Sequence, residues 1–155
     1  IKADKFVFYS DDIKKEDLWN KDIFRKKLQY GTDLGARMEN AFTELFQLNY
    51  EKVIIIGSDL LDLNTKHVDD AFELLENNEL VIGPAKDGGY YLLGMKTLHL
   101  NVFKNKDWGT STVFKETIKD IQNSNYALME ELNDIDTFED IKPYQQLRKF
   151  YNKND

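Results

Sequence analysis

The sequence predicts an α/β fold in which helices cover a mixed sheet. Short apolar runs alternate along the chain with longer segments of helical period, and turn residues separate the two kinds. The chain has 155 residues, of which 41% are hydrophobic, so it can bury one sizeable core. We therefore expect a single domain spanning residues 1–155, built from βαβ units.

The apolar runs predict five strands. Residues 6–10 and 53–57 are continuous apolar runs, typical of strands that helices cover on both faces, and residues 80–83 form a shorter run of the same kind. Residues 90–95 follow residues 80–83 too closely for a helical crossover, so we expect these two strands to pair antiparallel. Residues 126–131 form a weaker strand, and the predicted sheet is mixed.

The predicted helices are identified by apolar residues at three- and four-residue spacing, in residues 34–46, 68–75, 111–121 and 137–147. Asn64 and Thr65 provide a cap for the second of them. We interpret His67, in the first turn of that helix, as solvated, the alternative being that it reaches the mouth of the site. We interpret residues 25–27 (RKK) as solvated charge, the alternative being that they steer phosphate.

The composition excludes several classes of function. The formal net charge is −7 and no basic cluster stands out, which disfavours binding to nucleic acid or to an anionic membrane. The chain has no cysteine, which excludes disulfides and thiolate sites, and only two histidines, which nearly excludes a histidine-rich metal site. The chemistry must therefore rest on carboxylates. The chain has no apolar stretch long enough for a membrane span, so we expect a cytoplasmic protein.

Residues that directly follow strands are the first candidates for a site, because ligands of open α/β sheets bind beyond the carboxyl ends of the strands. Asp59 follows the buried run 53–57 and a small-residue turn, which makes it a candidate ligand for Mg²⁺ or Mn²⁺. The alternative is that Asp59 only caps the turn. Asp136 stands before a predicted helix as a candidate second ligand, although acids favour helix N-termini for electrostatic reasons alone.

A loop rich in glycine, residues 83–90 (GPAKDGGY), lies between two predicted strands. Its paired Gly88 and Gly89 expose backbone N–H groups that suit a phosphate or a sugar. Asp87-Gly88 is also a common hairpin turn, so this loop alone does not distinguish a ligand site from an ordinary turn. Together, the two acids at different strand ends and the loop between them indicate metal-assisted transfer from a nucleotide.

Four motifs carry a family resemblance: residues 57–63 (GSDLLDL), 83–94 (GPAKDGGYYLLG), 108–111 (WGTS) and 134–140 (DIDTFED). With them the chain resembles a bacterial GT-A-like family of nucleotide-diphospho-sugar transferases (glycosyltransferases) of unknown function. That family is similar in fold to the guanylyltransferases for molybdenum cofactor and for 2-phospho-lactate. The resemblance implies a Rossmann-like three-layer α/β/α sandwich that binds a nucleotide with a divalent metal.

The resemblance also implies roles for individual residues. Asp59 and Asp136 would hold the metal, and Gln29, Gly31, Gly35 and Arg37 would lie near the nucleotide. Gly88, Gly89, Tyr90 and Trp108 would line the sugar or acceptor side, with Asp87 as base or sugar contact. The alternatives are a surface position for Arg37 and an ordinary core position for Trp108.

Family members begin with a strand and a phosphate-binding loop that this chain lacks, so we expect an N-terminally truncated domain. The leading hypothesis is metal-dependent glycosyl transfer from a nucleotide-diphospho-sugar to a small acceptor. The alternatives are nucleotidyl transfer, in which a phosphorylated small molecule attacks a nucleoside triphosphate and releases pyrophosphate, and a non-catalytic nucleotide-binding remnant. The sequence does not indicate the acceptor, the nucleobase or the oligomeric state.

Overall fold

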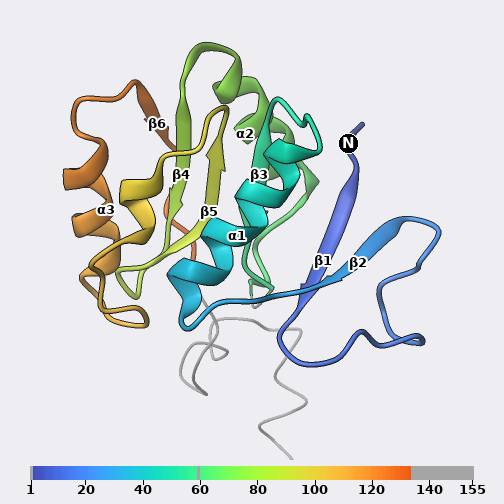
Figure 1. Cartoon of the computed structure of the whole chain (residues 1–155). Helices are drawn as coiled ribbons and strands as arrows, with labels where there is room; N and C mark the ends of the chain where they lie inside the picture. The colour runs from blue at the N-terminus through green and yellow to red at the C-terminus, as the bar shows by residue number, and fades with distance from the viewer. Residues whose placement is uncertain (1, 59, 134–155) are drawn as a thin grey trace, which may run out of the picture.

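The computed structural model describes residues 2–58 and 60–133 (Figure 1). The described residues form strands, three α-helices and one short 3₁₀ helix that alternate along the chain. In chain order these elements are β1 (Lys5–Tyr9), β2 (Phe24–Leu28), α1 (Leu34–Gln47), β3 (Val53–Ile56), α2 (Thr65–Asn77), β4 (Leu80–Pro84), β5 (Tyr90–Met95), η1 (Leu100–Phe103), α3 (Val113–Ile121) and β6 (Tyr126–Leu128). The predicted helix at 137–147 lies outside the described residues.

The strands form two sheets. One holds β1 and β2 in parallel, and the other has the order β3-β5-β4-β6. In the larger sheet β5 runs antiparallel to both β3 and β4, with Leu93 opposite Ile55 on one side and Ile82 on the other, while β4 and β6 are parallel. The expected mixed sheet and the expected antiparallel strand at 90–95 are confirmed.

Helices cover both faces of the larger sheet, as the three-layer sandwich requires (Figure 1). Successive residues of β4 show the alternation that directs side chains to opposite faces. Leu80 and Ile82 join a core cluster that also holds residues of α1, η1 and α3, whereas Val81 joins a second cluster with α2. The expected α/β fold class is therefore confirmed.

The interpretation of residues 25–27 as solvated charge is correct for Arg25, whose side chain is 62% exposed, and wrong for Lys26 and Lys27, which are partly buried within β2. Lys26 is largely covered, its side chain being 9% exposed, and its Nζ lies 2.8 Å from Oδ1 of Asp17. Lys27 forms an ion pair with Glu44 of α1. The polar sequence of this segment does not predict a strand. The two lysines can occupy one because their aliphatic stems pack and their ammonium groups form ion pairs.

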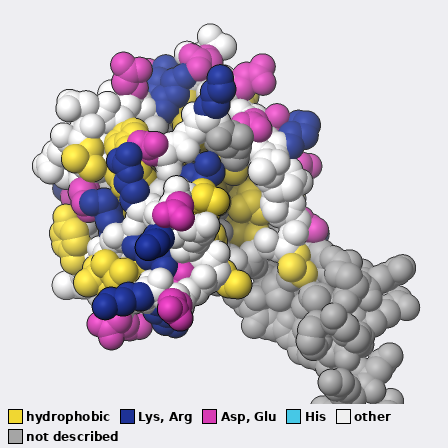
Figure 2. Space-filling model, turned by 90° about the vertical axis from the view of Figure 1, so that its right-hand side faces the viewer, with side chains coloured by type: hydrophobic (Ala, Val, Ile, Leu, Met, Phe, Trp, Pro, Cys, Tyr) yellow, Lys and Arg dark blue, Asp and Glu magenta, His cyan; other side chains and the backbone are white. Residues whose placement is uncertain are grey.

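The surface carries mixed charge. On the face shown in Figure 2, the described basic and acidic side chains are interspersed rather than gathered in separate patches. Among the described residues, no helix is long and apolar enough to cross a membrane.

Candidate functional site

A cleft of about 980 Å³ runs between β1 and β3. Phe6 and Phe8 of β1 and residues 53–56 of β3 line its apolar part, and Gly57 and Ser58 line it just beyond the carboxyl end of β3. Six of the nine residues expected to bind substrate or nucleotide line this one cleft, although they come from four separate parts of the chain. They are Gln29, Arg37, Asp87, Gly89, Tyr90 and Trp108.

Gln29 and Arg37 form a polar part of the cleft wall. Gln29 follows β2, and its Nε2 donates to the carbonyl of Phe8 at 3.0 Å. Arg37, in the first turn of α1, donates from Nη1 to Oε1 of Gln29 and from Nε to the carbonyl of Gly31, both at 3.4 Å. These contacts hold the guanidinium beside the cleft while using only part of its five donors, so it can bind an anion there.

The backbone at three glycines, Gly31, Gly35 and Gly88, lies so close to neighbouring atoms that a side chain would not fit. Gly31 and Gly88 have φ values of +141° and +93°, which side chains rarely adopt. A Cβ on Gly31 would lie 2.7 Å from the backbone N of Arg37. These three glycines do not themselves line the cleft, and their role in the structure is to let neighbouring segments pack closely.

Asp87 belongs to the β4–β5 hairpin. Its Oδ1 accepts a hydrogen bond from the N–H of Gly89 at 2.7 Å, and the N–H of Gly88 donates to the carbonyl of Ala85 at 3.1 Å. The hairpin alternative thus describes the local geometry of this loop. Because Asp87 also lines the cleft, the turn holds a carboxylate at the cleft wall.

Tyr90 places a buried phenol in the cleft. Its Oη is inaccessible to solvent and has no hydrogen-bond partner among the described residues. Burial raises the pKa of this phenol, which keeps it protonated and able to donate. Its ring packs edge-on against Trp108, with the ring centroids 6.5 Å apart. A buried polar group without a partner is costly in the free protein, and a ligand can accept a hydrogen bond from this hydroxyl only where the side chains that cover it move aside.

The two candidate metal ligands, Asp59 and Asp136, lie outside the described residues. Ser58, which precedes Asp59, lines the cleft, and Leu132, four residues before Asp136, forms a parallel bridge with Ala85 just beyond β4. Among the residues that the structure describes, no group of three or more His, Asp or Glu side chains forms a metal site.

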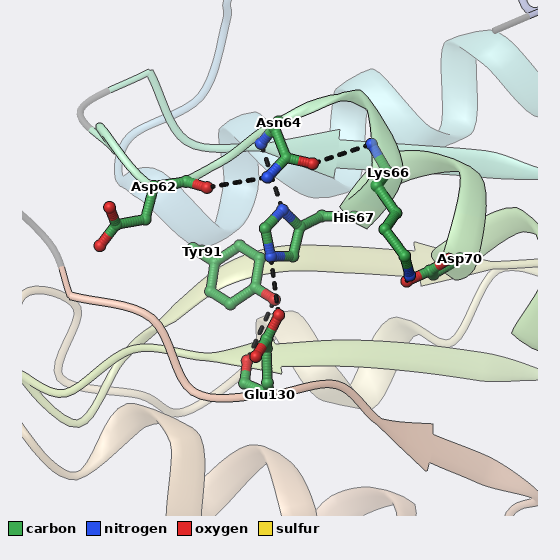
Figure 3. Close-up of polar contacts among 7 residues, drawn as sticks. All are labelled: Asp62, Asn64, Lys66, His67, Asp70, Tyr91 and Glu130. Carbon is green, nitrogen blue, oxygen red and sulfur yellow. Dashed lines mark hydrogen bonds and ion pairs between the residues drawn. The ribbon is translucent and has the colours of Figure 1, made fainter.

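The interpretation of His67 as solvated is wrong. His67 is 8% exposed, and its ring lies between Asn64 and Glu130 (Figure 3). Asn64 caps α2 as expected, and His67 completes a capping box with it. A glutamate or glutamine is the usual residue at this third helical position, so sequence reasoning missed a histidine in the same role.

Comparisons with known proteins give a consistent picture. The model of the family described as "Uncharacterized protein conserved in bacteria (DUF2064)" matches residues 1–110. A 2-phospho-L-lactate guanylyltransferase of Methanocaldococcus jannaschii is 30% identical over 108 residues, which cover 67% of this chain and 47% of that protein. The enzyme of the same name from Methanocaldococcus vulcanius is 27% identical over 89 residues, covering 57% of this chain and 39% of that protein. The chain thus spans about half the length or less of these curated relatives.

A solved structure is similar over nearly the whole chain. It is the crystal structure of a "putative nucleotide-diphospho-sugar transferase" from Desulfovibrio desulfuricans G20, with a TM-score of 0.83 and 29% sequence identity. The match covers 99% of this chain and 69% of that protein. The fold of the described residues is therefore that of this neighbour.

Proposed function

Because the chain belongs to the DUF2064 family of bacterial proteins, we propose that it is a transferase whose cleft binds a nucleotide-diphospho-sugar and moves the sugar to a small acceptor. The name of the similar solved structure supports the nucleotide-sugar donor. One fold serves many chemistries, so the family and the fold alone do not identify the reaction. The reaction must be inferred from the residues that line the cleft.

The observation that carries the proposal is the convergence of unrelated segments on one cleft. The same space is lined by an arginine held by a glutamine, by a hairpin carboxylate, and by a buried phenol that has no hydrogen-bond partner among the described residues. The arginine supplies charge and paired donors for a diphosphate, and the phenol supplies a neutral donor. The carboxylate can accept a proton or a hydroxyl hydrogen bond.

We assign the roles as follows. Arg37 binds the phosphates, and Gln29 orients Arg37 through the hydrogen bond to Nη1. Tyr90 donates to an oxygen of the donor sugar or diphosphate, and Trp108 forms the wall against which that group lies. Asp87 uses one oxygen to hold the turn, which leaves the other to accept the proton of the attacking hydroxyl.

A divalent cation, Mg²⁺ or Mn²⁺, fits the chemistry of carboxylate ligands and of a net-acidic protein that must hold a diphosphate. It would neutralise charge on the leaving diphosphate. Asp59 and Asp136 are the proposed ligands. Ser58, which precedes Asp59, lines the cleft, and Leu132, four residues before Asp136, lies beyond the carboxyl end of β4.

Nucleotidyl transfer is a second candidate, favoured by the two curated relatives that are named guanylyltransferases. In this reaction a phosphorylated small molecule attacks the α-phosphate of GTP, a new phosphoanhydride bond forms, and pyrophosphate leaves. The same arginine and the same proposed metal ligands would serve. The leaving group separates the two candidates, since glycosyl transfer releases a nucleoside diphosphate.

The proposal is tested by thermal stabilisation with nucleotide sugars and nucleoside triphosphates, each with and without Mn²⁺. A ligand at 100 times its dissociation constant adds about 2.7 kcal/mol to the free energy of unfolding. We expect a metal-dependent shift for one ligand class, lost in Asp59→Ala. Asp69→Ala, which removes an exposed acid of α2, is the control for the loss of charge.

A ligand that binds must next be tested for turnover. Incubation of the stabilising ligand with candidate acceptors should release either a nucleoside diphosphate or pyrophosphate, which identifies the reaction. If no ligand stabilises the wild type, the proposed function is wrong. Stabilisation by a nucleotide without turnover would instead favour the non-catalytic nucleotide-binding remnant. Binding that is equally strong in Asp59→Ala would contradict the metal role alone.

A further inference from the structure

The cleft separates two strand edges. Among the described residues, β1 pairs only with β2, and β3, the last strand of the larger sheet, pairs only with β5. Consecutive residues line the cleft on both sides, 6–8 from β1 and 53–56 from β3. Side chains alternate between the two faces of a strand, so a cavity against one face would meet every second residue. The cleft therefore runs along the edges of β1 and β3.

The pairing of β3 with β5 shows which backbone groups of β3 face the cleft. The N–H of Gly57 donates to the carbonyl of Tyr91 at 2.9 Å. In an antiparallel pair every second residue bonds to the partner strand, so the backbone of Ile55 also faces β5. Ile54 and Ile56 direct their N–H and C=O groups to the opposite side, which is the open edge.

The same alternation identifies the open edge of β1. The N–H of Gln29 donates to the carbonyl of Tyr9 at 2.8 Å, so the backbone groups of Tyr9 and Val7 face β2. Phe6 and Phe8 direct their backbone groups to the cleft. The side chain of Gln29 donates to the carbonyl of Phe8 at 3.0 Å, as expected for a carbonyl outside the β1–β2 ladder. Both edges thus present backbone donors and acceptors at every second residue.

The surroundings of the gap are those of a strand in the central layer. Val53–Ile56 contains neither charge nor proline, which edge strands commonly use to avoid further pairing, and a continuous apolar run is typical of a strand inside a sheet. Helices of both outer layers line the gap. One face of α1 contributes residues at three- and four-residue spacing, and α2 contributes one residue: Leu34, Met38, Ala41, Leu45 and Phe72.

We propose that the apolar part of the cleft is the position of a further β-strand, which joins the two sheets in the order β2-β1-strand-β3-β5-β4-β6. An extended chain supplies backbone partners at the repeat that both edges present, whereas a nucleotide has no such series of donors and acceptors. The strand fills the apolar part and leaves the polar residues of the wall to a ligand, so it does not depend on the proposed function.

The occupant is a segment of the same protein that lies outside residues 1–155. A gap covered by helices on both sides suits a segment that folds with the protein better than a separate peptide that must enter it. The similar solved structure has further chain of its own, because the match covers 99% of this chain but 69% of that protein.

Hydrogen exchange of backbone amides, measured without nucleotide, tests the edges. In residues 1–155 we expect the amides of Ile54 and Ile56 to exchange about 10-fold faster than that of Ile55, which is bonded to β5. In the protein expressed from its complete gene this difference should vanish, because both sides of β3 are then paired. Comparison within one strand is independent of the overall stability of either protein. If residues 1–155 alone do not fold, the complete protein still decides.

Nuclear Overhauser effects in the complete protein identify the occupant. The amides of Phe6 and Ile54 should both show contacts to one segment outside residues 1–155, as cross-strand neighbours do. A complete gene that encodes no further residues would overturn the proposal, and so would amides of Ile54 and Ile56 that still exchange faster than that of Ile55. Protection that appears only with a dimeric mass in light scattering would show that a second copy pairs with the edges instead, which also overturns it.

Discussion

Gly35 and Trp108 lie so close together that a side chain at position 35 would collide with the indole. An ideal Cβ on Gly35 would stand 2.5 Å from Cζ2 and Nε1 of Trp108 and 2.6 Å from the carbonyl oxygen of Phe103. Gly35 belongs to the first turn of α1, two residues before Arg37. The glycine thus brings the helix that carries the proposed phosphate ligand against the aromatic wall of the cleft.

Gly35→Ala should lower the free energy of unfolding by about 1–3 kcal/mol, the usual cost of overpacking. This sign is opposite to that expected in an open helix, where alanine is favoured over glycine by about 1 kcal/mol. Urea denaturation measures the change. In a Trp108→Ala background the same substitution should cost less, although the Phe103 carbonyl remains close. An equal cost in both backgrounds would show that the indole is not the obstacle.

Tyr90→Phe should leave the stability of the free protein unchanged or raise it by up to about 1 kcal/mol, because the buried hydroxyl has no partner among the described residues. Stabilisation by the nucleotide ligand should decrease at the same time, since the donor in the cleft is lost. Thermal unfolding with and without ligand measures both effects.

The matched control is Tyr9→Phe. The hydroxyl of Tyr9, a residue of β1 that does not line the cleft, donates to Asp17. Its loss should lower stability and leave the ligand response intact. A Tyr90→Phe variant that is clearly destabilised would mean that the hydroxyl has a partner in the free protein.

Asn64→Ala should lower the free energy of unfolding by about 1 kcal/mol, the usual cost of losing an N-cap. The side-chain oxygen of Asn64 accepts from the N–H of Lys66 at 2.9 Å at the start of α2. Asn64→Asp keeps an acceptor and adds a favourable charge at the helix N-terminus, so it should equal or exceed the wild type in denaturant titrations. If both variants lose the same stability, the cap is not the source of the effect.

The sequence predicted the elements whose pattern reflects burial. The apolar runs within Val53–Ile56 and Leu80–Pro84 indicate strands because their side chains pack against helices. β2 was missed because its residues (FRKKL) satisfy their charges through partners distant in the sequence, among them Asp17 and Glu44. Pairing of this kind depends on the tertiary fold, which periodicity does not encode.

In the candidate site, too, the sequence predicted some residues correctly and missed a contact that depends on the tertiary fold. Residues such as Arg37 and Asp87 were identified from the resemblance and from the ends of strands, and the structure brings them to one cleft. The burial of His67 was missed, because Glu130 is 63 residues away in the chain. Whether Asp59 and Asp136 bind a metal stays a prediction.

The last prediction concerns the acid stability of the β1–β2 sheet. Hydrogen bonds from Lys26 and then from Tyr9 lower the pKa of Asp17 from 3.8 to about 2. Since the pKa is lower in the folded state, the charged Asp17 stabilises the fold above pH 4, and this contribution is lost as the pH falls from about 4 to 2. Asp17→Asn should therefore be less stable than the wild type at pH 6, with the difference in the free energy of unfolding shrinking toward pH 2. Urea titrations across this range test it, with the exposed Asp12→Asn as control, and a difference that stays constant with pH would contradict the assignment.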